Sequence, residues 1–336
     1  MLNPRARAAP VPSAPVRTLP EGFDVSRLAP SLAQGWGIVP TEADYLAVGF
    51  GSYHWGVSGD DGRRHFVTVD DLDHKPWFGR TREAAHVGLA KAFDTARDLI
   101  GDCALEFVVA PLPTTQGTAI HRVGERHTVA VFPFVEGRSG DFGDELTPTD
   151  RAELLHLLGR LHRASPQAAT PRVDVPFPER GDLELALQEV DRTWNGGPYS
   201  EPARAWLVDR SATLRRQLRE FDRLHGQLTH DDLVITHGEP HPGNLIRGDD
   251  HLVLIDWDTV ALAPPERDLW MLSGPDGQAL TEYVDATGHE VDPAALALYR
   301  LAWSLGDVGS FISLFRAGHE HTEDTEQAWD SLTGST

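Results

Sequence analysis

Two short stretches of the chain, ITHGEPHPGNLI and IDWD, combine residue types that can perform chemistry. The first contains His237, Glu239 and Asn244, and the second contains Asp256 and Asp258 on the next apolar run. A carboxylate beside an alcohol can accept its proton, while an amide oxygen and a second carboxylate can hold Mg²⁺ between nucleotide phosphates. Glu239 suits the first role, and Asn244 and Asp256 suit the second. We expect His237 to be structural and to fix the loop.

Two other interpretations of these residues remain open. Gly, Pro, Asn and His are ordinary loop residues, so the first stretch could be no more than a turn between two strands. His237, Glu239 and His241 also alternate, and in an extended segment they would point the same way and could bind zinc. Pro240 and Pro242 interrupt a regular strand, however, which argues against that arrangement.

The composition indicates a globular protein with an acidic surface. Of its 336 residues 40% are hydrophobic, its single cysteine excludes an internal disulfide, and no apolar run approaches the ~20 residues that span a bilayer. The net charge of −21 argues against nucleic acid or an anionic membrane as partner and favours a cationic small molecule, although general solubility would also explain it. We expect a cytoplasmic protein that is a monomer or a weak dimer.

Hydropathy periodicity predicts an α+β fold in two parts. Residues 1–22 are expected to be a disordered leader, 23–135 an antiparallel sheet with one crossing helix, 136–320 a mainly helical part, and 321–336 a flexible tail. Helices are expected at 24–37, 81–99, 147–164, 182–194, 201–225 and 293–317, with strands at 104–112 and 128–135, three strands within 44–72, and a strand or hairpin within 114–127. The apolar runs LVIT and LVLI on either side of the first stretch suggest a small hairpin among helices.

The paired stretches THGEPHPGNLI and LIDWDTVALAPPERDLW resemble the catalytic and metal-binding loops of the aminoglycoside phosphotransferase family, whose members are relatives of the protein kinases. The resemblance covers about residues 24–318 and implies a two-lobed, protein-kinase-like fold and a small-molecule kinase that uses ATP or GTP with Mg²⁺. The segments SLAQGWG, GFGSYHW and FVTVDDLD resemble an actinobacterial branch similar to spectinomycin phosphotransferases.

The resemblance assigns roles to individual residues. It makes Glu239 the counterpart of the catalytic aspartate, Asn244 and Asp256 the metal ligands, and Asp258 a supporting carboxylate. It also makes VFPFVEG the hinge, whose main chain would bind adenine near Phe132 and Phe134, and it makes GFGSYH the cover of the phosphates, with Gly51 and Ser52 close to the nucleotide.

The chain departs from the family pattern at two positions. Glu239 replaces the usual aspartate, and the third strand has Thr68 or Val69 where the family has a lysine. Lys75, just beyond that strand, is either a replacement phosphate ligand, which Glu83 could pair with, or an ordinary solvent-facing lysine. Without a lysine the chain could be a catalytically weak nucleotide-binding protein.

The substrate that the resemblance implies is an aminoglycoside or aminocyclitol antibiotic, phosphorylated on a hydroxyl group. Clustered carboxylates would attract such a polyamine, and Asp258, Asp268 and Asp307 are the candidates. A helix cap is the alternative role for Asp268. Other acidic residues near these elements are Asp231, Asp232 and Glu266. A metabolic alcohol such as an amino sugar or a choline-like compound is the alternative substrate.

Overall fold

The computed structural model describes residues 22–48, 51–75, 77–79, 81–165, 170–228, 232–249, 251–273 and 278–334. They fall into two compact units. The described residues of the sheet unit lie within 22–173 and 232–291, and those of the helical unit lie within 174–228 and 292–334. The sheet unit therefore extends beyond the predicted boundary at residue 135, because described residues within 136–173 and 232–291 group with the sheet. The predicted leader lies outside the described residues except for Gly22.

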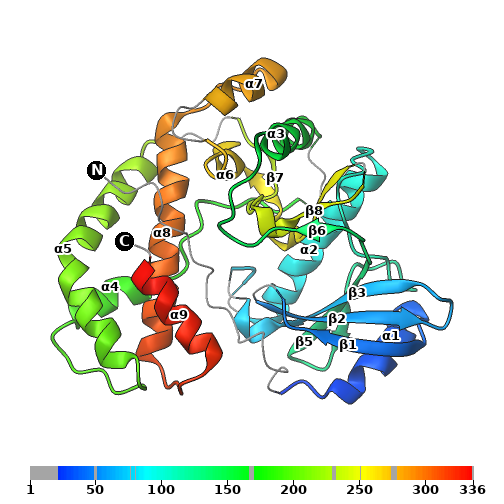
Figure 1. The fold of residues 1–336 in the computed structure, drawn as a ribbon, viewed down its shortest axis with the longest axis horizontal. Coiled ribbons are helices and arrows are strands. Elements are labelled where there is room, and N and C mark those ends of the chain that lie inside the picture. Colours follow the sequence, from blue (N-terminus) through cyan, green and yellow to red (C-terminus); the bar gives the residue numbers. More distant parts are fainter. Residues whose placement is uncertain are drawn as a thin grey trace. The chain divides into compact units, whose positions relative to one another are not determined.

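The sheet unit is built on an antiparallel sheet of five strands in the order β1-β2-β3-β5-β4 (Figure 1). Its strands are β1 (Pro40–Leu46), β2 (Ser52–Gly59), β3 (Arg64–Asp71), β4 (His121–Val123) and β5 (His127–Pro133). Its helices are α1 (Leu28–Trp36), α2 (Arg82–Gly101), α3 (Pro148–His162), α6 (Glu266–Leu269) and α7 (Gln278–Thr287), and short 3-10 turns are η1 (Val25–Arg27), η2 (Leu72–His74), η3 (Pro242–Asn244) and η4 (Trp257–Thr259). The predicted antiparallel sheet with one long crossing helix is confirmed.

The two faces of the sheet are covered by different helices, because alternate residues of a strand point to opposite faces. Trp55 and Val67 pack on one face against Leu32 of α1. Phe132 packs on the other face against Phe93 of α2, with ring centroids 5.5 Å apart. Burial of large apolar side chains on both sides makes this sheet the core of the unit.

Sequence signals for helix starts hold at α2 and α3. The Thr81 hydroxyl accepts the Ala84 N–H at 3.2 Å, and the Thr147 hydroxyl accepts the Asp150 N–H at 3.1 Å. Each cap satisfies an N–H group that has no partner inside its helix. Pro148 in the first turn of α3 costs no hydrogen bond there.

Residues 104–112 do not form the predicted strand. Val108 makes an isolated parallel bridge to Leu254, and the segment otherwise has no ladder. Ala104 has φ 53°, a left-handed conformation that strands do not adopt. Leu105 and Phe107 are nevertheless buried, so the apolar run reflects burial and not strand pairing.

The runs LVIT and LVLI do not pair with each other, so the predicted hairpin is wrong. Residues Val234–Thr236 form β7, which pairs with β10 (Ala261–Ala263), and β9 (Leu252–Leu254) pairs with β8 (Leu245–Arg247). A tight connection between β8 and β9 closes a hairpin inside the segment, which leaves β7 to find another partner. A third strand, β6 (Arg138–Ser139), joins β8 on its other edge.

The helical unit contains α4 (Arg180–Gln188), α5 (Ser200–His225), α8 (Pro293–Arg316) and α9 (Glu323–Gly334). The first three confirm predicted helices, and α5 and α8 lie side by side in it (Figure 1). The expected flexible tail is wrong, because α9 packs on α8 and buries Ala328 and Leu332. Their i, i+4 spacing gives this segment an apolar face that the prediction overlooked.

Among the described residues, no helix combines the length and apolar character needed to cross a bilayer.

Candidate active site

The two polar stretches meet at one end of the β8–β9 hairpin. Leu245 pairs with Leu254, and just beyond this pair the Ile255 N–H donates to the Asn244 carbonyl at 3.0 Å. Asn244 and Asp256 therefore flank the same hairpin end, Asn244 just before β8 and Asp256 shortly after β9. The structure brings these two predicted metal ligands together.

The side chain of Asn244 is held in one orientation. Its amide nitrogen donates to the Glu239 carbonyl at 3.0 Å and lies 3.2 Å from Nε2 of His241. Burial lowers the pKa of His241 to about 3, so this ring is neutral at physiological pH and can accept that hydrogen bond. With the amide nitrogen bound on this side, the amide oxygen faces the other way and can bind a cation.

Asp256 has an unusual backbone conformation, φ 64° and ψ 63°, which is left-handed and costly for a residue with a Cβ atom. Asp256 is exposed, yet the surrounding protein and the nearby charges of Asp258 and Glu239 raise the pKa of its carboxyl well above the usual value. A bound cation would relieve this repulsion. The amide and carboxylate oxygens of Asn244 and Asp256 therefore fit a hard divalent ion such as Mg²⁺.

Glu239 presents its carboxylate beside this pair. Its side chain is 34% exposed, and desolvation by the surrounding protein, with the Asp258 charge, raises the pKa of its carboxyl to about 7. The Glu239 N–H donates to Nδ1 of His237 at 3.2 Å, and Nε2 of the same ring donates to the Ile255 carbonyl at 2.9 Å. His237 is thus a buried structural residue that ties the loop to the hairpin, as predicted.

The zinc hypothesis is wrong for this arrangement. Both ring nitrogens of His237 are bound to main-chain groups, so neither has a lone pair to offer a metal. In the described part of the chain, no three His, Cys, Asp or Glu side chains converge where they could hold a metal ion.

Lys75 is buried, which excludes the solvent-facing alternative. Its ammonium group donates to Asp70 at 2.9 Å, to Asp258 at 3.0 Å and to the Ser52 hydroxyl at 3.0 Å. Burial alone would lower the pKa of Lys75, but the charges of Asp70, Asp258 and Asp256 outweigh it and raise this pKa above its usual value. An ammonium group is therefore fixed among the site carboxylates although the strand lysine is missing.

Glu83 is the predicted partner of Lys75, and Ser52 is predicted to lie close to the nucleotide phosphates. Glu83 does not pair with Lys75, because its carboxylate binds Arg122 at 2.6 Å. The Ser52 hydroxyl donates to Asp70 at 2.7 Å and accepts from Lys75, so its role here is to orient that pair. Gly51 precedes it at φ 80°, a conformation that favours glycine, and the residues before Gly51 in the predicted phosphate cover lie outside the described ranges.

The predicted hinge, residues 131–137, begins in the last residues of β5, and its two aromatic side chains already contact other groups. The Phe132 ring is buried in the core against α2, and the Arg64 guanidinium lies 3.8 Å from the centroid of the Phe134 ring. Any contact of these residues with adenine is left to the main chain.

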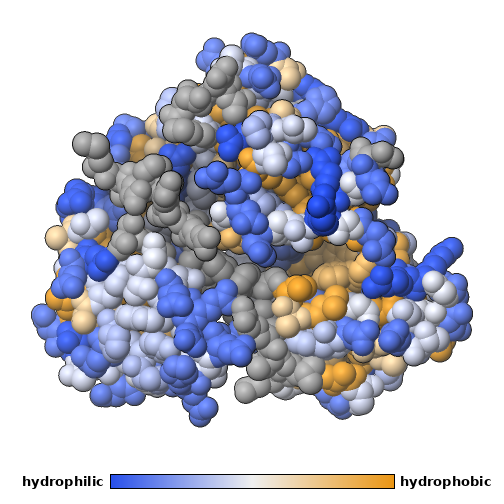
Figure 2. Space-filling model, viewed as in Figure 1, coloured by the Kyte–Doolittle hydropathy of each residue, from blue (hydrophilic) through white to orange (hydrophobic). Residues whose placement is uncertain are grey.

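Figure 2 shows apolar surface in a hollow between the sheet and the β6–β8–β9 ribbon. Partly buried apolar side chains that pack on the core around Phe132 include Phe66, Val135, Ile246 and Ile255.

Asp268 is not available to a substrate. It has no exposed surface, and its carboxylate accepts the N–H groups of His237 at 2.9 Å and of Gly238 at 2.6 Å. Nε2 of His162 lies 3.0 Å from the same carboxylate, and Nδ1 of that ring lies 2.6 Å from the Tyr283 hydroxyl. Asp268 therefore fixes the main chain of the loop that carries Glu239, and its predicted substrate role is wrong.

The other acidic candidates are scattered. Asp258 is at the site, Glu266 is buried on α6, and Asp232 is exposed. Asp307 is buried on α8 of the helical unit, so its role toward a substrate stays a prediction. Asp231 lies outside the described residues.

Sequence reasoning missed Asp70 and His162. Strand alternation from Thr68, the suspected lysine position, puts Asp70 on the same sheet face, so its place could have been inferred. His162 gave no such signal, because it ends an ordinary amphipathic helix and meets Asp268 only through the tertiary fold.

Glu239, Asn244 and Asp256 lie at one hairpin end, next to the buried ammonium group of Lys75. This combination of groups is that of a phosphotransferase of the kinase-like fold. The model of the phosphotransferase enzyme family matches residues 58–304, and the chain belongs to that family. Protein StrN of Streptomyces griseus is 32% identical over 251 residues, which cover 70% of this chain and 73% of that protein.

Solved structures show the same fold at low sequence identity. A spectinomycin phosphotransferase in complex with ADP and spectinomycin has a TM-score of 0.71, with 17% identity and 94% of each chain covered. A microcompartment-associated aminopropanol kinase has a TM-score of 0.60, with 17% identity, 93% of this chain and 95% of that chain covered. An amicoumacin kinase in complex with AMP-PNP and Ca²⁺ has a TM-score of 0.57, with 14% identity and 93% and 94% covered.

Family membership makes this protein a small-molecule phosphotransferase that acts on hydroxyl groups. The predicted family, fold class and enzyme class are confirmed.

Proposed function

We propose that this enzyme transfers the γ-phosphoryl group of ATP or GTP, with Mg²⁺, to a hydroxyl group of a cationic aminocyclitol or aminoglycoside. The observation that carries the proposal is that the Asn244 amide donates to the Glu239 carbonyl while the carboxyl groups of Glu239 and Asp256 are close enough to interact electrostatically. A base and a metal-binding pair so arranged match the needs of in-line phosphoryl transfer.

In the reaction, the substrate oxygen forms a bond to the γ-phosphorus as the bond from phosphorus to the bridging β–γ oxygen breaks. The hydroxyl proton passes to the Glu239 carboxylate, and the products are a phosphate ester and a nucleoside diphosphate. Asp268 and His237 hold the loop so that this carboxylate keeps its position. When bound, Mg²⁺ would offset charge on the phosphates, and Asn244 and Asp256 are the residues that would hold it.

The nucleotide would be bound by three features of the sheet unit. Lys75 offers a fixed ammonium group for a phosphate oxygen, held by Asp70 and Asp258 in the free enzyme. The apolar hollow beside the β6–β8–β9 ribbon suits a flat base, and the main chain after Pro133, at the end of β5, suits its polar edge.

A cationic acceptor is favoured by the charges at the site. Glu239, Asp256 and Asp258 lie close enough together to raise the pKa of Asp256, and they remain accessible to different degrees. The net charge of −21 would add long-range attraction for a polyamine. This reasoning supports amino sugars with several ammonium groups over neutral alcohols.

The test is turnover by the purified full chain with ATP or GTP, Mg²⁺ and a panel of aminoglycosides, aminocyclitols and small amino alcohols. Product would be detected as a phosphate ester by mass spectrometry. We expect the Glu239→Gln variant to lose about 10² to 10⁴-fold in kcat, which is the usual contribution of a general base. Glu125→Gln, which changes an exposed glutamate of the turn before β5, is the matched control.

Two results would contradict the proposal. One is the absence of any phosphorylated amine together with a Glu239→Gln variant that behaves like the wild type. The other is turnover of small amino alcohols alone, which would assign the enzyme to the metabolic alternative.

A further inference from the structure

Lys75 lies outside the regular part of the sheet. β3 ends at Asp71, the turn η2 follows, and Lys75 comes next with φ −120° and ψ 52°. A lysine within a strand would be positioned by the ladder hydrogen bonds, and Lys75 has no such support. The position of its ammonium group therefore depends on what holds η2 as well as on its own contacts with Asp70, Asp258 and Ser52.

Asp71 holds the first residues of η2. Its carboxylate has 2% exposed side-chain surface and accepts Nε of Arg126 at 2.9 Å, Nδ1 of His74 at 3.0 Å and the Asp73 N–H at 3.1 Å. Burial alone would raise the pKa of Asp71, but these hydrogen bonds, from His74 and Arg126 above all, hold it well below its usual range. The Leu72 N–H also donates to the Arg126 carbonyl at 2.9 Å, so Arg126 binds this turn through both main chain and side chain.

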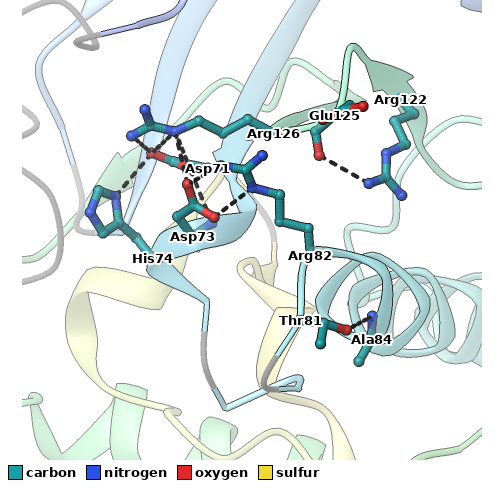
Figure 3. A network of polar contacts seen from close by, with 9 residues as sticks. All are labelled: Asp71, Asp73, His74, Thr81, Arg82, Ala84, Arg122, Glu125 and Arg126. Carbon is teal, nitrogen blue, oxygen red and sulfur yellow. Dashed lines mark hydrogen bonds and ion pairs between the residues drawn. The ribbon is translucent and has the colours of Figure 1, made fainter.

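A second, more exposed pair extends this support to α2. Arg82, the first residue of α2, binds Asp73 through two hydrogen bonds of 2.6 and 2.7 Å, and Arg126 Nε lies 3.5 Å from Asp73 (Figure 3). Figure 3 shows the Arg126 guanidinium facing the carboxylates of both aspartates, with Arg82 reaching Asp73 and His74 reaching Asp71 from other sides. Exposed ion pairs contribute little on their own, so the buried Asp71–Arg126 contact is the main one.

These contacts lie on the opposite side of the sheet from the lysine pair. Asp70 and Asp71 are consecutive in β3, and their side chains therefore leave opposite faces. Asp70 binds Ser52 and Lys75 on the site face, whereas Asp71 binds Arg126 on the other. Arg126 can thus affect the site only through the main chain of η2.

We infer that Arg126 and Asp71 are positioning residues for the Lys75 ammonium group. The inference rests on the proposed function, in which that group binds a nucleotide phosphate. In this chain the lysine has moved off the strand, and an ion pair on the far face of the sheet replaces the ladder as its support.

A double-mutant cycle on nucleotide binding tests the inference without requiring turnover. Lys75→Met, Arg126→Met and the double variant would be titrated with ATP and Mg²⁺ by calorimetry, below their unfolding temperatures. We expect Arg126→Met to weaken binding about tenfold in the wild type and less than about twofold in the Lys75→Met background, because both changes remove the same contact. The effect of Arg126→Met on the unfolding temperature should be equal in the wild type and in the Lys75→Met variant.

Two further variants separate positioning from general damage. Arg126→Lys keeps one charged donor to Asp71 and should recover part of the affinity. Arg122→Met removes a similar ion pair, with Glu83, that has no contact with η2, and should leave nucleotide affinity unchanged.

Equal losses from Arg126→Met in both backgrounds, or no loss in either, would overturn the inference. A wild-type protein that binds nucleotide but phosphorylates no acceptor would count against the proposed function alone. A wild-type protein that binds no nucleotide would overturn both.

Discussion

The Lys75 ammonium group joins Asp70 at the end of β3 to Asp258 after β9, at 2.9 and 3.0 Å. All three side chains are largely buried, with 2% of Lys75 and Asp70 and 12% of Asp258 exposed. An ion pair in such surroundings is costly to break, because the partner that remains is left charged and desolvated. The same contact therefore has a part in stability and in the proposed chemistry.

Replacing Lys75 should lower both the stability of the protein and its catalytic activity. We expect Lys75→Met to reduce the free energy of unfolding by about 3 to 5 kcal/mol, the usual cost of removing one partner of a buried pair. We also expect kcat/KM to fall at least about tenfold, through loss of a charge-assisted contact to phosphate. Urea unfolding and steady-state kinetics measure the two effects. Lys91→Met, at the only other lysine, which is exposed on α2, is the control and should be neutral.

An ammonium group returned to the strand should restore part of the activity of that variant. Thr68 lies two residues before Asp70 on the same sheet face, and its hydroxyl has no hydrogen-bond partner within the described residues. Thr68→Lys in the Lys75→Met background would place a charge near Asp70 from the regular strand. Recovery of kcat/KM over the single variant is the expected result, and a double variant that folds but stays inactive would contradict it.

Local patterns in the sequence predicted the residues whose chemistry depends on spacing within one hairpin. Glu239, Asn244 and Asp256 come together because β8 and β9 are neighbours in the chain. Local patterns do not predict contacts that depend on long-range packing. No pattern in the sequence indicates that Lys75 contacts Asp258.

Misjudged elements have a similar physical cause. The apolar run at residues 104–112 predicts a strand, but the sequence of such a run does not distinguish a strand in a sheet from a buried loop. The position of Asp268 close to the paired stretches suggests a substrate role. The sequence does not reveal that its carboxylate already accepts two main-chain N–H groups.

Asp268 should be more important to the loop than any single exposed carboxylate. In Asp268→Asn, one accepting oxygen becomes an amide group that cannot accept the Gly238 or His237 N–H, which leaves a buried donor unpaired at a cost of about 1 to 3 kcal/mol. We expect a lower free energy of unfolding and a lower kcat, since the loop carries Glu239. Asp249→Asn, at an exposed position after β8, should change neither.

The Mg²⁺-binding role proposed for Asp256 can be tested directly. We expect chelation to abolish turnover and Asp256→Asn to raise the Mg²⁺ concentration for half-maximal rate by about tenfold or more, because one of two hard oxygen ligands loses its charge. The initial rate would be measured against Mg²⁺ at saturating nucleotide. An unchanged Mg²⁺ dependence would show that Asp256 does not bind the ion.

The His74–Asp71 pair should make stability depend on pH in a predictable direction. The hydrogen bond to Asp71 raises the pKa of His74 in the folded protein above its usual value of 6.5. A raised folded-state pKa stabilises the protein below the unfolded-state pKa, and this contribution is lost as pH rises through the folded-state pKa. His74→Gln should therefore lower the free energy of unfolding by about 0.2 to 1 kcal/mol near pH 5.5, the range for a half-exposed ion pair, and by almost nothing near pH 9.

Asp71 sets the acid limit of the same effect. Its folded-state pKa is lowered, so its contribution is present above its unfolded-state pKa and is lost as the pH falls toward the lowered value. Urea unfolding of the wild type and His74→Gln at pH 5.5 and pH 9 measures the difference, with His156→Gln, at an exposed position on α3, as control. A His74→Gln effect that is equal at both pH values would mean that a neutral histidine is enough to hold Asp71.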